Sequence, residues 1–304
     1  MRAHRASSTA AWIARALALV SRERRFAPVV PPDLALANDR LLAGIPGGAG
    51  FRRALEHAPV RALLLAAERR LLPGIALHYL LRKRRLEELV RTSLDAGISR
   101  VVVLGAGFDT LALRLHREYP AVSFVEVDHP ATQRAKRRGL EGCGELRSNL
   151  RLLPCDLRAG AHGLLLDYAE ADGHDGLPTI AVAEGLLMYL SPTMVNALFA
   201  SFGRSRSARR IVFTFMAASG ARRTPRFADA SPLVDHWLRL RGEPFRWGCP
   251  PIELAALLGR SDWKLALVEG SDELRRRYLA GTGLLGEPLA VGEEIAVAEA
   301  TLTR

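Results

Sequence analysis

The feature that most constrains this chain is a change of pattern near residue 100, where short apolar runs begin to alternate with helix-length segments. Five runs rich in Val, Ile and Leu lie at 100–105, 121–127, 150–155, 179–184 and 210–216. They are apolar on both faces, which is typical of parallel strands covered by helices on both sides. The predicted fold class is therefore α/β, a doubly wound Rossmann-like sheet.

Two further runs at 263–269 and 294–302 come late in the chain, with the turn residues GTGLLGEP between them. We expect them to form an antiparallel pair at one edge of the otherwise parallel sheet.

The chain before residue 96 reads as helical rather than stranded. Residues 8–95 show helical periodicity, and the segment ALHYLLRKRRLEELVRTSLDAG at 76–97 is expected to end with Gly97 as its cap. We predict a helical extension over 1–95, packed as a lid on a core over 96–304, the whole forming one compact unit. The first helix is expected to place one apolar face inward: Trp12, Ile13, Ala16, Leu17 and Val20.

The composition argues against a nucleic acid, a membrane or a metal as a partner of this chain. The net charge of +11 invites a nucleic-acid interpretation, but 40 of the 43 basic residues are Arg (43 less Lys83, Lys136 and Lys264), and they are scattered without interleaved aromatic residues. We therefore do not expect a nucleic-acid partner. No apolar run reaches the roughly 20 residues of a membrane span. The three cysteines show no metal-binding spacing, so we expect no metal and a reducing, cytoplasmic setting.

The stretch VVVLGAGFDTLALRL places a glycine turn after the first strand. Gly105, Ala106 and Gly107 let the backbone turn tightly and let a ligand approach closely. Thr110 holds the place of the third glycine of a dinucleotide fingerprint, and Asp109 would repel a phosphate. Asp109 therefore favours a ligand without phosphates, although the alternative that Asp109 or Thr110 only caps the next helix is equally open.

Acidic residues follow three other strands. Asp128 lies 23 positions after Gly105 (128 − 105) and suits the two hydroxyls of a ribose; Glu126 lies one pleat earlier, and His129 is interpreted as an incidental neighbour. Asp156 with Leu157 suits the amino group and ring of an adenine.

Glu184 follows four apolar residues at the end of its strand and needs a cationic or hydrogen-bonding partner. Tyr189 is a candidate substrate contact. Together the acids indicate an adenosine ligand that carries positive charge, and S-adenosyl-L-methionine fits that description. The Arg82–Arg85 cluster can supply a counter-charge for its carboxylate.

The motifs SSTAAWIARA, LLRKRRLEELV, VVVLGAGFDTLALRL, FVEVDHP, PCDLR and AEGLLMYL occur in an order that resembles the leucine carboxyl methyltransferase family. The similarity spans about 7–270 and is nearest to bacterial S-adenosylmethionine-dependent O-methyltransferases, some of which act on polyketides. It implies a class I methyltransferase fold. It also implies cofactor roles for Arg82 at the methionine carboxylate, Gly105 and Gly107 at the nearby backbone, Asp128 at the ribose, Asp156 and Leu157 at the adenine, and Glu184 at the amino-acid end. Leu111 departs from the family's more usual arginine.

The predicted reaction is SN2 transfer of the sulfonium methyl group to an oxygen of a small-molecule acceptor. A carboxylate acceptor is already ionised and needs no general base, so no catalytic residue is assigned; a hydroxyl acceptor would need one. The acceptor is expected to lie against the N-terminal helices and 217–250. Three alternatives remain open at this point: a nicotinamide-dependent oxidoreductase, an RNA-modifying carboxyl methyltransferase, and a catalytically inactive binding module.

Overall fold

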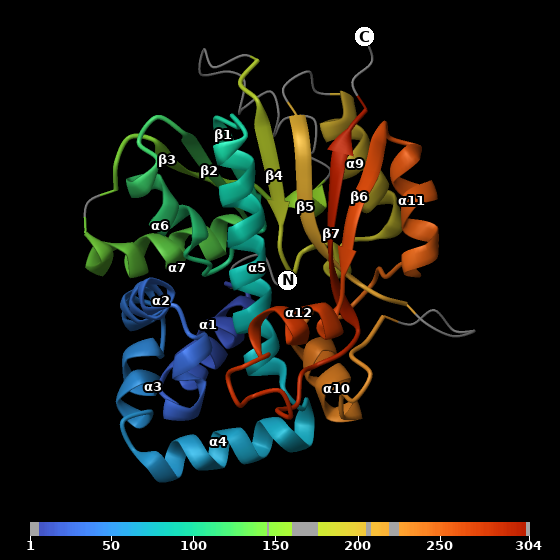
Figure 1. The fold of residues 1–304 in the computed structure, drawn as a ribbon. Coiled ribbons are helices and arrows are strands. Elements are labelled where there is room, and N and C mark those ends of the chain that lie inside the picture. Colours follow the sequence, from blue (N-terminus) through green and yellow to red (C-terminus); the bar gives the residue numbers. More distant parts are fainter. Residues whose placement is uncertain (1–5, 145, 160–175, 205–207, 219–224, 302–304) are drawn as a thin grey trace.

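A computed structural model describes residues 6–144, 146–159, 176–204, 208–218 and 225–301. Its centre is a seven-stranded sheet in the order β3-β2-β1-β4-β5-β7-β6 (Figure 1). The five parallel strands are β1 (Arg100–Leu104), β2 (Ser123–Asp128), β3 (Leu150–Pro154), β4 (Thr179–Ala183) and β5 (Ala208–Met216). Each lies within two residues of its predicted bounds, so the predicted α/β sheet is confirmed.

The predicted antiparallel edge is also confirmed, with one feature that the sequence did not indicate. β6 (Trp263–Glu269) and β7 (Glu293–Ala300) pair antiparallel, and β7 pairs antiparallel with β5 as well. The last strand of the chain therefore lies between β5 and β6. Residue 302, the last of the predicted strand, lies outside the described residues.

Alternate residues of each central strand pack against different helices. Val101 and Val103 belong to a buried cluster that includes residues of α5 (Ile75–Asp95), α6 (Leu111–Glu118) and α12 (Ser271–Tyr278). Val102 and Leu104 belong to a second cluster, with residues of α9 (Pro192–Arg204) and α11 (Pro251–Gly259). Because neighbouring residues of a strand point to opposite faces, this alternation explains why the strands are apolar throughout.

The N-terminal third of the chain is helical, as predicted. The helices α1 (Ser8–Ser21), α2 (Pro32–Gly44), α3 (Gly48–Ala54) and α4 (Ala58–Leu71) gather below the sheet in Figure 1, and α5 rises from them across one sheet face. One buried cluster runs from α1 and α5 onto β1 and β4. Gly97 follows α5 with a φ of 94°, in the region that favours glycine.

The remaining elements connect these layers. They are α7 (Pro130–Leu140) after β2, α10 (Pro232–Arg241) before α11, and short 3-10 turns at Arg24–Val29, Glu141–Cys143, Leu157–Ala159 and Leu187–Tyr189.

One residue of the predicted α1 core face is placed wrongly by the sequence analysis. Ala16, Leu17 and Val20 are buried, but Trp12 is 40% exposed. The helix packs on α5 along one side and on α2 and α3 along another. Trp12 lies between these two sides, near the start of the helix, where the neighbouring helices do not cover it.

Candidate functional site

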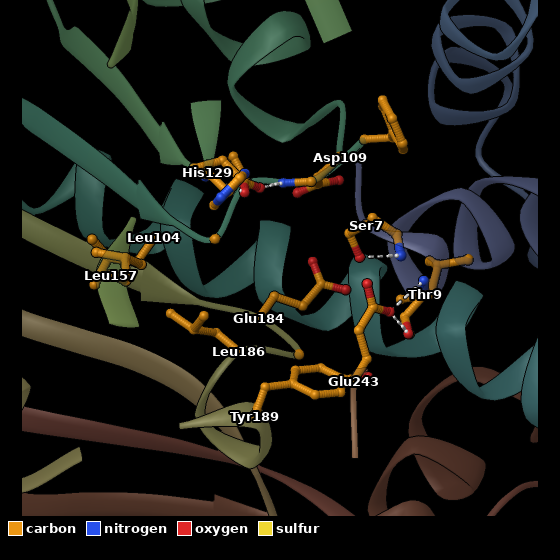
Figure 2. A pocket seen from close by; sticks show the side chains of 18 of the residues that line it. Ser7, Thr9, Leu104, Asp109, His129, Leu157, Glu184, Leu186, Tyr189 and Glu243 are labelled. Atoms are coloured by element: carbon orange, nitrogen blue, oxygen red, sulfur yellow. Dashed lines mark hydrogen bonds between the residues drawn. The ribbon is translucent and has the colours of Figure 1, made fainter. Parts of the chain in front are cut away.

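A pocket lies at the carboxyl ends of the parallel strands, where chain order reverses between β1 and β4. This edge is the usual ligand position in open α/β sheets. The pocket holds about 1190 Å³ of empty space, a volume that includes open solvent at its mouth. All of the predicted site residues line it: Arg82, Gly105, Ala106, Gly107, Asp109, Asp128, Asp156, Leu157, Glu184 and Tyr189. Figure 2 shows several of them, with Ser7, Thr9 and Glu243 from the opposite wall.

The glycine turn after β1 needs its glycines. Gly105 and Gly107 have φ values of 64° and 51°. A Cβ at Gly105 would lie 2.9 Å from a methyl carbon of Leu186, and one at Gly107 would lie 3.0 Å from the Cβ of Ala10. The turn therefore packs tightly against both walls of the pocket, with no side chain of its own in the way of a ligand.

Asp128 at the end of β2 joins two backbone segments. Its carboxylate accepts hydrogen bonds from the N–H groups of Gly107 and His129. Burial nevertheless raises the pKa of Asp128 to about 6, against the opposing effect of those two donors. A carboxylate has about four acceptor positions, so two remain for the hydroxyls of a bound ribose.

His129 is the cap of α7, in agreement with its interpretation as a neighbour of the site. Its Nδ1 accepts the N–H of Ala131 at 3.2 Å. Burial lowers the pKa of this imidazole.

Asp156 and Leu157 follow β3 at the other end of the pocket. The Asp156 carboxylate accepts from the backbone N–H and the guanidinium of Arg158, at 3.1–3.3 Å. Burial acts against this ion pair, but the pKa of Asp156 is lowered on balance. Leu157 is buried beside it, which leaves an apolar surface next to an acceptor, as the adenine prediction requires.

Glu184 and Asp109 are neutralised within the protein. The Lys83 ammonium lies 2.7 Å from Asp109 Oδ1 and 3.0 Å from Glu184 Oε2. Arg82 contacts the other oxygen of Glu184 at 2.8 Å and Glu293 at 2.6 Å. Burial of Asp109 acts in the opposite direction, but the neighbouring Lys83 lowers the pKa of Asp109 to about 2. The prediction that Glu184 needs a cationic partner is confirmed.

Lys83 is a pocket residue that was not predicted from the sequence. The four acids were interpreted as a group without internal counter-charge, whereas Lys83 bridges two of them. A signal was present in the composition: the chain has three lysines against 40 arginines. Two of the three, Lys83 and Lys136, are buried and paired with acids.

The other arginines of the 82–85 cluster point elsewhere. Arg84 donates to the carbonyl of Val29 and lies over the ring of Tyr278. Arg85 pairs with Glu269. Of the three arginines in this cluster, Arg82 is the one that lines the pocket, although its predicted contact with a cofactor carboxylate remains a prediction.

The wall opposite the strands is the start of α1, and Glu243 holds it in place. The Glu243 carboxylate follows α10 and accepts from the N–H groups of Ser8 and Thr9 at 3.0 and 2.9 Å, and from the Thr9 hydroxyl at 2.5 Å. A negative charge is favourable at a helix N-terminus. The sequence analysis assigned neither Thr9 nor Glu243, because no local pattern indicates a contact between residues 234 positions apart.

Asp109 does not act as a side-chain cap of α6 in the usual manner. Thr110 occupies the cap position without a side-chain cap hydrogen bond, and Asp109 accepts the N–H of the adjacent Thr110 at 2.7 Å. The same Asp109 oxygen faces Lys83, so the carboxylate belongs to the pocket.

Tyr189 lies between the two walls, next to Glu243 in Figure 2. Its ring packs against Phe245 at a centroid distance of 5.5 Å. Burial raises the pKa of the phenol well above its ordinary value. The ring can therefore contact a substrate, but at neutral pH it is not a base.

Two further observations concern the described residues as a whole. Within them, no three His, Cys, Asp or Glu side chains are grouped in a way that could hold a metal ion. No helix among them has both the length and the apolar character needed to cross a membrane.

The known proteins that this chain resembles are methyltransferases by name. A protein of Frankia alni named "Putative S-adenosyl-L-methionine-dependent methyltransferase" is 29% identical over 79% of this chain and 79% of its own length. One of the same name from Streptomyces coelicolor is 30% identical over 60% of this chain and 64% of its own. The crystal structure of a methyltransferase, also titled putative, from Thermobifida fusca superposes with a TM-score of 0.54 at 18% identity, covering 90% of this chain and 98% of that one.

The structural likeness shows that the fold is that of a methyltransferase. The sequence pattern of the family described as leucine carboxyl methyltransferase matches residues 21–203, which is more than half of the chain. This region contains α5, the glycine turn and the ends of β1 to β4, and so most of the strand side of the pocket. The chain therefore belongs to the leucine carboxyl methyltransferase family and is an S-adenosylmethionine-dependent methyltransferase.

Proposed function

We propose that this methyltransferase methylates an oxygen of a small, largely apolar acceptor, and that the oxygen belongs to a carboxylate. The observation that carries this proposal is that each pocket carboxylate, and His129, already accepts a hydrogen bond from the protein. The carboxylates of Asp109, Asp128, Asp156, Glu184 and Glu243 all accept from protein donors, and His129 Nδ1 accepts from a backbone N–H. An acceptor that arrives ionised needs no base, whereas an alcohol or phenol does.

The strand side of the pocket fits S-adenosylmethionine. The glycine turn leaves a cradle that a Cβ would fill, Asp128 has free acceptor positions for the ribose, and Leu157 offers an apolar surface for the adenine. Glu184 and Arg82 present opposite charges for the amino-acid end. When bound, the cofactor supplies an activated methyl group.

The helix side fits the acceptor. Ile13 and Leu17 of α1 give this wall an apolar surface, which Leu186 and Tyr189 of the segment after β4 continue, and Arg246 lines the pocket as well. The protein's part in the reaction is to hold the acceptor oxygen in line with the methyl group and to exclude water from the gap. An apolar carboxylic acid, such as a polyketide-like acid, matches this surface.

The test is to incubate the protein with S-adenosylmethionine labelled in its methyl group and a panel of apolar carboxylic acids, each paired with the corresponding alcohol or phenol. We expect label in the acids, released by mild base because methyl esters hydrolyse. Label transferred mainly to the hydroxyl compounds, or label that survives mild base as an ether does, would overturn the carboxylate assignment while leaving the methyltransferase activity intact.

A further inference from the structure

Lys83 has a position in the pocket that its ion pairs do not fully explain. Its side chain is 7% exposed, lines the pocket, and lies between Asp109 and Glu184. Figure 2 shows these two acids at the pocket. A cation placed there for stability alone would serve equally well behind the wall, as Lys136 does for Glu126.

The donors of the two pocket cations can be counted. An ammonium has three N–H groups, and Lys83 directs two of them at Asp109 and Glu184. One donor remains, on a group that faces the pocket. Arg82 directs three of its five donors at Glu184 and Glu293, and its guanidinium lies over the ring of Tyr79.

At this end of the pocket, two positive and two negative side chains line the wall, and Glu293 pairs with Arg82 from outside the lining. Arg82 and Lys83 are positive, and Asp109 and Glu184 are negative. An α-amino acid carries an ammonium and a carboxylate on one carbon, so it can place each of its charges beside an opposite one without leaving a protein charge unpaired. A phosphate cannot, because it would face two carboxylates with no positive charge of its own.

The choice of lysine is itself informative in a chain that uses arginine at 40 of its 43 basic positions. A guanidinium is a flat fork whose donors all lie in one plane, whereas an ammonium is a compact charge whose three donors diverge from a single nitrogen. At Lys83, two protein carboxylates converge on a single nitrogen. That geometry accommodates a third carboxylate from a ligand on the pocket side.

We propose that Lys83 is a cofactor-binding residue: its free N–H donates to the carboxylate of the methionine part of S-adenosylmethionine, while Asp109 and Glu184 face the ammonium group. The assignment rests on the cofactor and is independent of the acceptor proposed above. The cofactor carboxylate would then have two cationic partners, Lys83 and the predicted Arg82.

The test removes the positive charge of Lys83 from the protein and, separately, the carboxylate from the ligand. Binding of three ligands to the wild type and to Lys83→Met is measured by calorimetry. S-Adenosylhomocysteine carries both charged groups, its decarboxylated analogue carries only the ammonium, and 5′-methylthioadenosine carries neither. We expect Lys83→Met to weaken S-adenosylhomocysteine about 10- to 100-fold, to leave methylthioadenosine within about threefold, and to leave the decarboxylated analogue unchanged or tighter.

Lys136→Met is the matched control, because Lys136 is also a buried lysine that pairs with an acid, Glu126, but it does not line the pocket. It is expected to lower the melting temperature and to leave all three affinities unchanged. Lys83→Arg, which keeps the charge, should retain part of the affinity for S-adenosylhomocysteine. If Lys83→Met does not fold, Asp109→Asn is added to remove the unpaired acid, and the three ligands are compared again.

An equal loss for all three ligands would overturn the proposal, because it would show that Lys83 only maintains the shape of the pocket. No loss for S-adenosylhomocysteine would overturn it as well. Failure of the wild type itself to bind S-adenosylhomocysteine would contradict the cofactor assignment, and the proposal with it.

Discussion

The two walls of the pocket are built in different ways. On the strand side, the glycine turn, Asp128 and Glu184 follow β1, β2 and β4, three neighbouring strands of a sheet that is buried on both faces. On the helix side, the start of α1 is joined to the loop after α10 by the carboxylate of Glu243. One wall rests on the whole sheet, whereas the first residues of α1 in the other wall are held by hydrogen bonds to a distant segment, ahead of the part of α1 that packs on α5.

This difference indicates that the two walls bind different ligands. The strand side presents the same kind of backbone edge that binds ligands in other doubly wound sheets, and it suits an invariant cofactor. The helix side presents side chains of α1 and of the loop that carries Glu243, and it suits an acceptor whose shape differs from one enzyme to another. Substitutions on the two sides should therefore affect different ligands, and four predictions test this separation.

The largest effect is expected on the strand side, for Asp128→Ala. The change removes the predicted acceptor for the ribose and the observed acceptor for the N–H groups of Gly107 and His129. Because hydrogen bonds to a charged group contribute about 1.5–3 kcal/mol each, affinity for S-adenosylhomocysteine should fall about 100-fold or more. Calorimetry measures it, with the exposed Asp95→Ala as the control. A change below about threefold would show that Asp128 does not contact the cofactor.

A smaller and different effect is expected on the helix side, for Glu243→Gln. The amide places a donor against the N–H groups of Ser8 and Thr9, which loosens the start of α1. The KM for the acceptor should rise about tenfold, with the affinity for S-adenosylhomocysteine within about threefold. Steady-state kinetics with a carboxylic acid acceptor measures the KM. A loss of cofactor affinity as large as that of Asp128→Ala would remove the distinction between the walls.

Acid should weaken cofactor binding through Asp128. Burial raises its pKa to about 6 in the free protein, and the ribose hydroxyls donate to the ionised form. The affinity should therefore be constant above pH 7 and fall by up to about tenfold for each pH unit below about 6. Titrations of 5′-methylthioadenosine between pH 5 and 8 measure this, and Asp128→Asn should show no such dependence. A wild-type affinity that is flat across this range would exclude ionisation of Asp128 from the binding step.

The smallest effect is expected for Trp12→Ser. Trp12 is 40% exposed on α1 and does not line the pocket, so the free energy of unfolding should change by no more than about 0.5 kcal/mol. Urea denaturation measures it. A loss of 2 kcal/mol or more, on the order of that for a buried side chain, would mean that α1 packs differently at its start.

Much of the strand side was predictable because its signals are local. An apolar run that ends in Gly105-Ala106-Gly107, or in an acid such as Asp128, marks a strand end by itself. The parallel arrangement then brings those ends to one edge of the sheet. The antiparallel partner of β6 was likewise indicated by the turn residues between the two late runs.

The rest depends on contacts that no local pattern encodes. The position of β7 between β5 and β6 depends on pairing with a strand about 80 residues earlier in the chain, which the pattern of the last run does not indicate. Glu243 and Thr9 meet across 234 positions, and the exposure of Trp12 depends on where α2, α3 and α5 pass α1. The contacts of Lys83 could not be predicted, because the sequence of a helix does not indicate whether a basic residue faces solvent or two buried acids.

The measurement that tests this account most directly is equilibrium binding of S-adenosylhomocysteine and of NADH to the same preparation, followed by the same titrations with Asp128→Ala. We predict that S-adenosylhomocysteine binds the wild type at one molecule per chain, that Asp128→Ala loses this binding, and that NADH binds neither. Tight binding of NADH in place of S-adenosylhomocysteine would contradict the assignment of the strand-end pocket to a cationic adenosine cofactor.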